Sequence, residues 1–135
     1  MSQTVLDADG RTPLHASIAH GQYSCALALI EKGAPLSTVD DKNNGPLHEA
    51  CSLDAGRVVQ QLLAYGAEVD AMNGDGWTPL MVSASVGAVD CATKLLQQMA
   101  DVNAVSPTLQ NSLHLAAARG HTAVIAYYDN GLMYC

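Results

Sequence analysis

The sequence repeats itself every 33 residues, and this period limits the folds that are open to the chain. The same dipeptide slot holds Pro13-Leu14, Pro46-Leu47, Pro79-Leu80 and Ser112-Leu113. Apolar pairs recur at the same spacing as Leu29-Ile30, Leu62-Leu63 and Leu95-Leu96. A register that holds through four units predicts one structural module repeated four times, with each module packed against its neighbours. The expected units are approximately 7–39, 40–72, 73–105 and 106–135 of a single domain, 1–135.

Each unit is predicted to fold as helix, turn, helix and long loop. In the first unit Thr12 is a suitable N-cap, and Pro13 is tolerated at the first helical position. We expect the first helix to end at about His20 and the second near Gly33, where glycine adopts a left-handed conformation without strain. Polar segments at 40–44 and 73–76 indicate tight turns. Because a pair of short helices cannot bury its apolar face alone, the pairs are expected to stack into an all-α, elongated, slightly curved solenoid.

Composition and charge exclude several classes of protein. Hydrophobic residues make up 49% of the 135 residues, which is enough for a buried core. The formal net charge of −7 argues against binding to nucleic acid or to anionic membranes. We expect neither a transmembrane helix nor a secretory signal. The four cysteines form no CxxC pair, so reduced thiols in a cytoplasmic or nuclear protein are expected.

The segment Thr12-Pro13-Leu14-His15-Ala16, on its 33-residue period, resembles the ankyrin repeat. The resemblance extends from about Asp7 to Gly131. It implies L-shaped units whose turn tips project at right angles to antiparallel helix pairs. It also implies a concave surface of turn tips and first helices that binds another protein, as in a scaffold or adaptor.

Two narrower interpretations of this resemblance stay open. Residues 75–80, Asp-Gly-Trp-Thr-Pro-Leu, are similar to those of gankyrin-like proteasome assembly chaperones. Alternatively, the chain is an ankyrin domain of a larger enzyme, channel or ubiquitin-ligase receptor whose activity lies elsewhere. The full-length reading frame would distinguish the two.

The sequence departs from the repeat pattern at several positions. Gly45 stands where the other units have a capping side chain, and Met81 replaces the motif histidine. Met99 occupies a glycine slot, so we expect strain of about 1 kcal/mol or a changed turn there. The fourth tip, 107–109, lacks its glycine. The apolar segment Leu132–Cys135 predicts weak self-association through the C-terminal face, because solenoid ends need a polar outer face.

Residue patterns that suggest chemistry have simpler structural interpretations. His15, His48 and His114 share one slot, but stacked repeats lie roughly 10 Å apart, too far for one zinc ion. We expect these imidazoles to bond the backbone of adjacent turns. Cys25 and Cys91 share a slot that is expected to face the core. His48 and Cys51 form a conceivable dyad, disfavoured because first helices are mostly packed. We therefore expect no enzyme activity, metal or cofactor.

Contact residues are carried over from the ankyrin resemblance, slot by slot. The tip residues are Asp9 and Arg11, Lys42 and Asn44, Asp75 and Trp77, and Thr108 and Gln110. The first-helix residues are His20, Leu53, Val86 and Arg119. Trp77, the single tryptophan, is either a binding anchor flanked by Arg11 and Arg119 or a brace against the neighbouring tip, because amphipathic aromatic residues serve both purposes.

Overall fold

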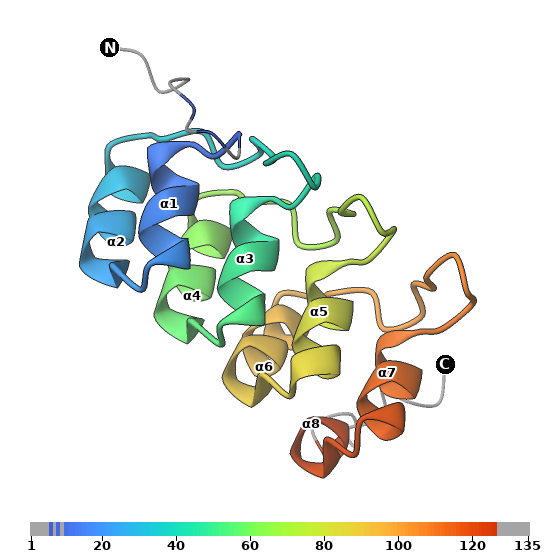
Figure 1. The fold of residues 1–135 in the computed structure, drawn as a ribbon. Helices are drawn as coiled ribbons and strands as arrows, with labels where there is room; N and C mark the ends of the chain where they lie inside the picture. The colour runs from blue at the N-terminus through green and yellow to red at the C-terminus, as the bar shows by residue number, and fades with distance from the viewer. Residues whose placement is uncertain (1–5, 7, 9, 127–135) are drawn as a thin grey trace.

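The computed structural model describes residues 6, 8 and 10–126, which form the expected all-α repeat solenoid (Figure 1). Eight helices in this part of the chain make four antiparallel pairs. The pairs are α1 (Pro13–Ala19) with α2 (Tyr23–Glu31), α3 (Pro46–Ser52) with α4 (Gly56–Ala64), α5 (Pro79–Val86) with α6 (Val89–Gln97), and α7 (Ser112–Ala118) with α8 (Thr122–Ala126).

The helices form two layers that run along the array. The inner layer consists of the first helices, α1, α3, α5 and α7, and each contacts the next in this order. The outer layer consists of α2, α4, α6 and α8, which contact one another in the same way. The loops that join successive pairs extend to one side of the array, where their tips lie in a row (Figure 1). Each repeat therefore presents the same kinds of surface as its neighbours.

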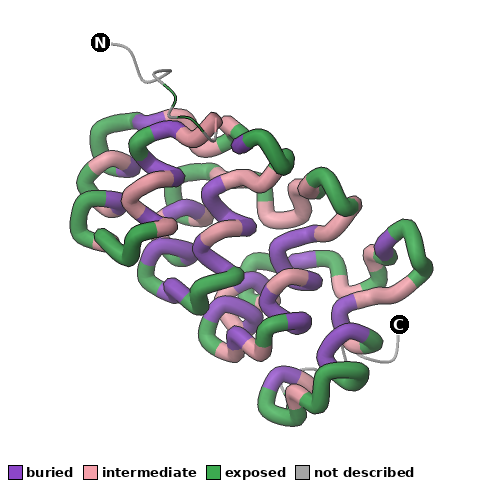
Figure 2. Tube along the Cα trace, viewed as in Figure 1, coloured by how far each residue is buried: buried purple, intermediate pink, exposed green. Residues whose placement is uncertain are grey.

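The core lies between the two helix layers and between successive repeats. Buried segments follow the helices along the whole array, whereas the tips and the outer faces are exposed (Figure 2). Leu14, Leu47 and Leu80 are equivalent and buried, as are Ala26, Val59 and Ala92. The small residues of this second slot allow the layers to approach closely. Burial at fixed 33-residue spacing is the packing that the repeat predicts.

Side chains at the start of the inner helices follow the capping prediction. Thr12 Oγ1 accepts a hydrogen bond from the amide of His15 at 3.3 Å, and Thr78 Oγ1 accepts from that of Met81 at 3.3 Å. Asn111 caps α7 in the same way. Gly45 begins α3 without a side chain, so this helix lacks the cap, as expected. Such a cap contributes about 1 kcal/mol to helix stability.

Residues with a left-handed backbone conformation, in which φ is positive, recur in three slots of the repeat. One slot follows the second helix and holds Gly33, Gly66 and Met99, with φ of 85°, 99° and 63°. Met99 therefore keeps the turn of its glycine equivalents and bears the expected backbone strain. A second slot, at the tips, holds Gly10, Asn43, Gly76 and Leu109, with φ of 73°, 62°, 74° and 63°. The third, between paired helices, holds Gly21, Asp54, Gly87 and Gly120.

The prediction that Cys25 faces the core was wrong. Cys25 is exposed, whereas Cys91, two periods later, is fully buried. The Sγ of Cys91 lies 3.9 Å from the carbonyl oxygen of Ala50, which belongs to the preceding repeat. This slot is thus covered by the repeat before it, and within the described residues no repeat precedes Cys25. Burial in a solenoid depends on the neighbour as well as on the slot.

Residues 127–135, including the apolar segment on which the self-association prediction rests, lie outside the described part of the chain. Within the part that is described, no helix has both the length and the apolar character needed to cross a membrane.

Candidate protein-binding surface

One polar side chain organises the turn at each of the tips of repeats two to four. Asp40 Oδ1 accepts hydrogen bonds from the amides of Lys42, at 2.9 Å, and Asn44, at 3.0 Å. Asn73 Oδ1 accepts in the same way from the amides of Asp75 and Trp77, at 2.9 and 3.0 Å. In the fourth repeat Ser106 holds the equivalent position. These bonds occupy backbone donors that a turn leaves unpaired, so the tips are fixed in shape.

The motif histidines join each inner helix to the tip of the next repeat, as predicted. His15 Nε2 lies 2.9 Å from the carbonyl oxygen of Asn44, and His48 Nε2 lies 2.9 Å from that of Trp77. Met81, in the equivalent slot, has no such nitrogen. His114 is exposed, and its Nδ1 accepts from the amide of Asn111. The prediction is therefore confirmed for the first two histidines, and the third and fourth repeats are joined without this bond.

His48 is structural, because both of its ring nitrogens are occupied. Nδ1 accepts from the amide of Gly45 at 3.4 Å, so Nε2 must carry the hydrogen that it donates to the carbonyl oxygen of Trp77. Burial lowers the pKa of His48 below its ordinary value of 6.5, and bonds to backbone carbonyls oppose this only in part. The imidazole is thus neutral at pH 7, and neither nitrogen is free to activate a nucleophile.

The buried thiols are equally unsuited to catalysis. Cys51 and Cys91 have no exposed surface. A hydrogen bond with Cys51 and burial both raise the pKa of Cys91, so its reactive thiolate form is suppressed. Within the described ranges, no group of three or more His, Cys, Asp or Glu side chains is placed to hold a metal ion.

Eleven of the twelve predicted contact residues fall into three slots with uniform exposure, and Asp9 lies outside the described residues. The first tip slot, with Lys42, Asp75 and Thr108, is exposed. The slot at the end of the inner helices is exposed in all four repeats and holds His20, Leu53, Val86 and Arg119. The second tip slot is half-buried in all four repeats and holds Arg11, Asn44, Trp77 and Gln110.

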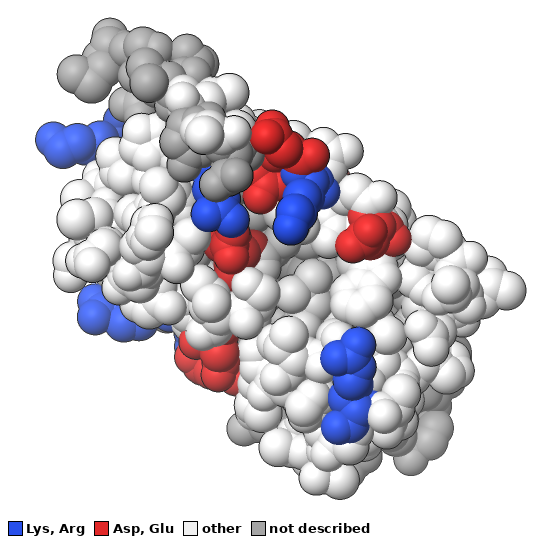
Figure 3. Space-filling model, in the orientation of Figure 1, with Lys and Arg blue, Asp and Glu red and all other residues white. Residues whose placement is uncertain are grey.

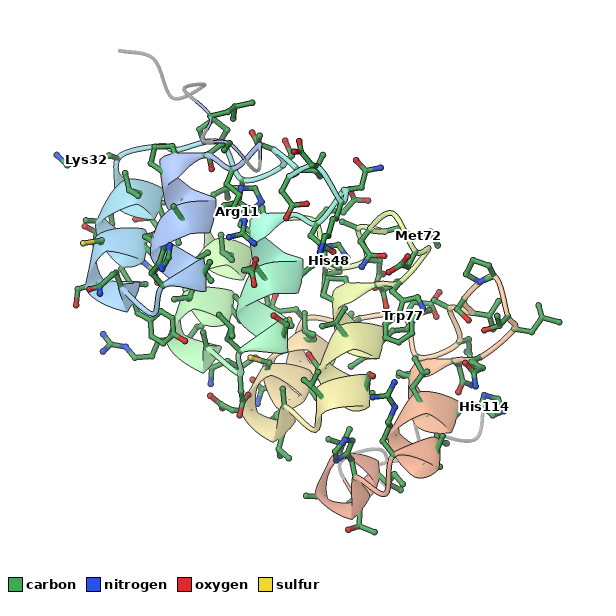
Figure 4. All side chains as sticks on the ribbon, in the orientation of Figure 1. Arg11, Lys32, His48, Met72, Trp77 and His114 are labelled. Atoms are coloured by element: carbon green, nitrogen blue, oxygen red, sulfur yellow. The ribbon has the colours of Figure 1, made fainter. Side chains whose placement is uncertain are left out.

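In the first two repeats, the half-buried slot contacts the next repeat. Arg11 lies 4.0 Å from Asp40 and 3.7 Å from Glu49, in ion pairs that link the first repeat to the second. The side-chain amide of Asn73 donates to Asn44 Oδ1 at 2.9 Å, which links the second tip to the third. Trp77 packs against the edge of the core. Arg11 and Trp77 lie apart along the array, with His48 between them (Figure 4), so Arg11 does not flank Trp77.

Charge is distributed unevenly over the face formed by the inner helices and tips. Acidic and basic side chains gather near the tips of the first repeats, and much of the remaining face is uncharged (Figure 3). The sequence explains this pattern, because residues 76–89 and 102–118 contain no Asp, Glu, Lys or Arg. The face therefore carries most of its charge on repeats one and two, whereas the charged contact residues of repeats three and four are Asp75 and Arg119.

One surface slot was missed by the sequence analysis. Large apolar side chains just before each tip are exposed at 33-residue spacing: Leu6 at 51%, Val39 at 42%, Met72 at 60% and Val105 at 47%. Leu109, at the fourth tip, is 76% exposed. The signal was present in the period, since an apolar residue stands in this slot in every unit. Apolarity was not a sign of burial here, because these loop side chains remain exposed to solvent in every repeat.

Comparison with known proteins identifies the repeat. The family model for ankyrin repeats, in three copies, matches residues 2–73 and 47–127. The chain belongs to the ankyrin repeat family. Ankyrin repeats are in general non-catalytic modules that bind other proteins. The structural roles of His48 and of the buried thiols Cys51 and Cys91 agree with this. The resemblance of the 33-residue repeat to the ankyrin repeat is thereby confirmed.

Curated relatives of this ankyrin repeat chain include very long proteins. It is 35% identical over 127 residues, 93% of its length, to neurogenic locus notch homolog protein 1 of Mus musculus and of Homo sapiens. It is 33% identical over 131 residues to neurogenic locus notch homolog protein 2 of Homo sapiens. The chain spans only about 5% of the length of each of these relatives.

Proposed function

We propose that this chain binds a protein partner through the concave surface formed by its tips and inner helices. The observation that carries the proposal is the uniform exposure of two predicted slots. The slot at the ends of the inner helices and the first tip slot face solvent in every repeat where they are described. The described side chains of these slots make no hydrogen bond or ion pair with another repeat, so they are available to another molecule.

The partner is expected to present two kinds of surface. Lys42 and the neighbouring acidic residues give the tip of repeat two a polar character. Repeats three and four offer Val86, 48% exposed, and Leu109, and their charged contact residues are Asp75 and Arg119. Interfaces derive most of their affinity from a desolvated apolar centre with a polar rim. We therefore place the centre of the contact on repeats three and four and its rim on repeats one and two.

The role is that of a non-catalytic adaptor or scaffold, in which the shape of the surface selects the partner. A second candidate is a binding domain within a longer protein that carries an activity elsewhere, such as an enzyme, a channel or a ubiquitin-ligase receptor. The length of the notch relatives favours this second candidate. An assembly chaperone of the gankyrin kind remains a narrower form of the first.

The experiment compares two single carboxylates placed on opposite faces. Val86→Asp puts a charge on the proposed contact, and Gln60→Asp puts one on the exposed face of outer helix α4. A partner is first isolated on immobilised wild-type chain from the native source, and its affinity is then measured by calorimetry. We expect Val86→Asp to weaken binding at least about tenfold, because a buried unpaired charge costs more than 1.4 kcal/mol. We expect Gln60→Asp to change affinity less than about twofold. The reverse order would reject the concave surface.

A further inference from the structure

A groove of about 760 Å³ lies between two successive repeat loops. One wall is the loop from Leu36 to Val39, and the other is the loop from Gly66 to Met72. The start of α3 closes the groove with Leu47 and His48. None of the twelve predicted contact residues lines it. His48 and Met72 lie close together in this part of the molecule (Figure 4).

The groove has an apolar interior and apolar lips. Leu36 and Leu47 line it from within, and Val39 and Met72 stand at its opening. Val39 and Met72 are equivalent residues of successive repeats, so the groove lies between two members of the exposed apolar slot. Methionine is unbranched and polarisable, which lets it adapt to ligands of different shape. The groove is thus suited to an apolar side chain supplied by another molecule.

The charged groups that line the groove are both acidic. Glu68 and Asp70 stand on the loop from Gly66 to Met72, and no Lys or Arg lines the groove. Asp70 is held in place, because its Oδ1 accepts from the amide of Asp101 in the next repeat at 3.0 Å. Glu68 is exposed, and its carboxylate makes no hydrogen bond or ion pair within the described residues. An apolar cavity beside fixed negative charge attracts a cation that is attached to an apolar group.

We propose that this groove is a second docking site, which binds an extended segment of a protein carrying one apolar side chain next to Lys or Arg. The apolar side chain enters between Val39 and Met72, and the basic residue lies against Glu68 and Asp70. The site is separate from the concave surface, so one chain can hold two segments at once. The proposal does not depend on the concave contact, because the two sets of lining residues do not overlap.

The test is selection of random twelve-residue peptides, displayed on phage, against the full wild-type chain. Enriched sequences are synthesised with a fluorescent label, and their affinities are measured by anisotropy at low and high salt. We expect enriched peptides to combine an apolar residue with adjacent Lys or Arg and to bind more weakly at high salt. Met72→Asp is expected to weaken them at least about tenfold, and Glu68→Lys roughly fivefold.

Matched variants separate this groove from other surfaces. Glu31→Lys makes the same charge change on outer helix α2, and Val86→Asp alters the concave face; neither is expected to change peptide affinity more than about twofold. Circular dichroism melts check that Met72→Asp folds, which we expect because Met72 is 60% exposed. The proposal is overturned if no peptide is enriched, or if Val86→Asp rather than Met72→Asp weakens the enriched peptides. It is also overturned if Met72→Asp leaves peptide affinity unchanged and removes only self-association of the chain.

Discussion

At the scale of single residues, the repeat tolerates side chains that its backbone disfavours. Met99 has a φ of 63° in a slot where Gly33 and Gly66 stand in earlier repeats. A left-handed conformation costs a residue with a Cβ roughly 1–2 kcal/mol. The side chain of Met99 is 84% exposed, so packing does not offset this cost. The turn keeps its shape because the surrounding bonds fix it, including the amide of Ala100 to the carbonyl oxygen of Leu95.

We predict that Met99→Gly raises the free energy of unfolding by about 0.5–1 kcal/mol. The substitution relieves the left-handed strain, and the greater freedom of glycine in the unfolded chain removes part of the gain. Urea denaturation measures the change. The control is Gly66→Ala, expected to destabilise by about 1 kcal/mol through conformation alone, since a Cβ there meets nothing within 4 Å. A loss of stability in Met99→Gly would show that the Met99 side chain makes stabilising contacts in the folded chain.

We also predict that His48 makes the fold sensitive to mild acid. Its folded pKa lies below the ordinary value of 6.5, so the unfolded chain takes up the proton first as pH falls. The stability that neutral His48 contributes is complete above pH 6.5 and declines as the pH falls toward the folded pKa.

His48→Gln tests the prediction, because glutamine keeps an N–H donor for the carbonyl oxygen of Trp77 and does not titrate. The excess stability of the wild type over this variant should shrink between pH 7.5 and pH 5.5, as measured by urea denaturation. Other titrating groups are common to both chains and cancel in the difference. A difference that stays constant, or grows in acid, contradicts the assignment.

At the scale of elements, one repeat is held to the next by packed helices, histidine bonds, the half-buried tip slot and loop bonds such as that from the amide of Asp101 to Asp70. Arg11 and Asn44 each reach the following tip or inner helix. Trp77 occupies the same slot in the third repeat, where Met81 leaves the histidine bond unmade. The tips of repeats three and four are in close contact, since a Cβ on Gly76 would lie 2.8 Å from the ring of Pro107. By analogy with Arg11 and Asn44 in the same slot, we expect Trp77 to act as a brace.

We predict that Trp77→Ala lowers the free energy of unfolding by about 1–3 kcal/mol, less than the 3–5 kcal/mol of a fully buried aromatic residue. Asp75→Ala, on the same tip but exposed, should change stability by less than about 0.5 kcal/mol. Thermal melts and partner affinity are measured on both variants. An unchanged melting temperature with affinity weakened by about 2 kcal/mol or more would assign Trp77 to the interface instead.

The sequence predicted the elements better than their exposure. The period located the helix pairs, because Pro at the first turn and Gly after each helix act locally. It did not reveal that Cys25 is exposed while Cys91 is buried, since that difference comes from a neighbouring repeat. Nor did apolar character distinguish Met72 on the surface from Met81 in the core. Local signals determine an element, and the facing repeat determines what the element buries.

At the scale of the whole molecule, the array separates structure from recognition. Contacts between repeats use the core, the histidines, the loops and the half-buried tip slot, whereas the described side chains of the two exposed slots make no hydrogen bond or ion pair between repeats. Two surfaces result: the face of tips and inner helices, whose charged side chains lie mostly on repeats one and two, and the acidic groove between loops. Because stability in such arrays is a sum of neighbouring contacts, surface residues are free to vary without loss of the fold.

Hydrogen exchange of the chain, with and without its isolated partner, locates the protein-binding surface. We predict that binding slows amide exchange in the tips and inner helices, 40–53, 73–86 and 106–119, and leaves outer helices α4 and α6 unchanged. Slowed exchange confined to the outer helices, with the tips and inner helices unaffected, would contradict a concave protein-binding surface.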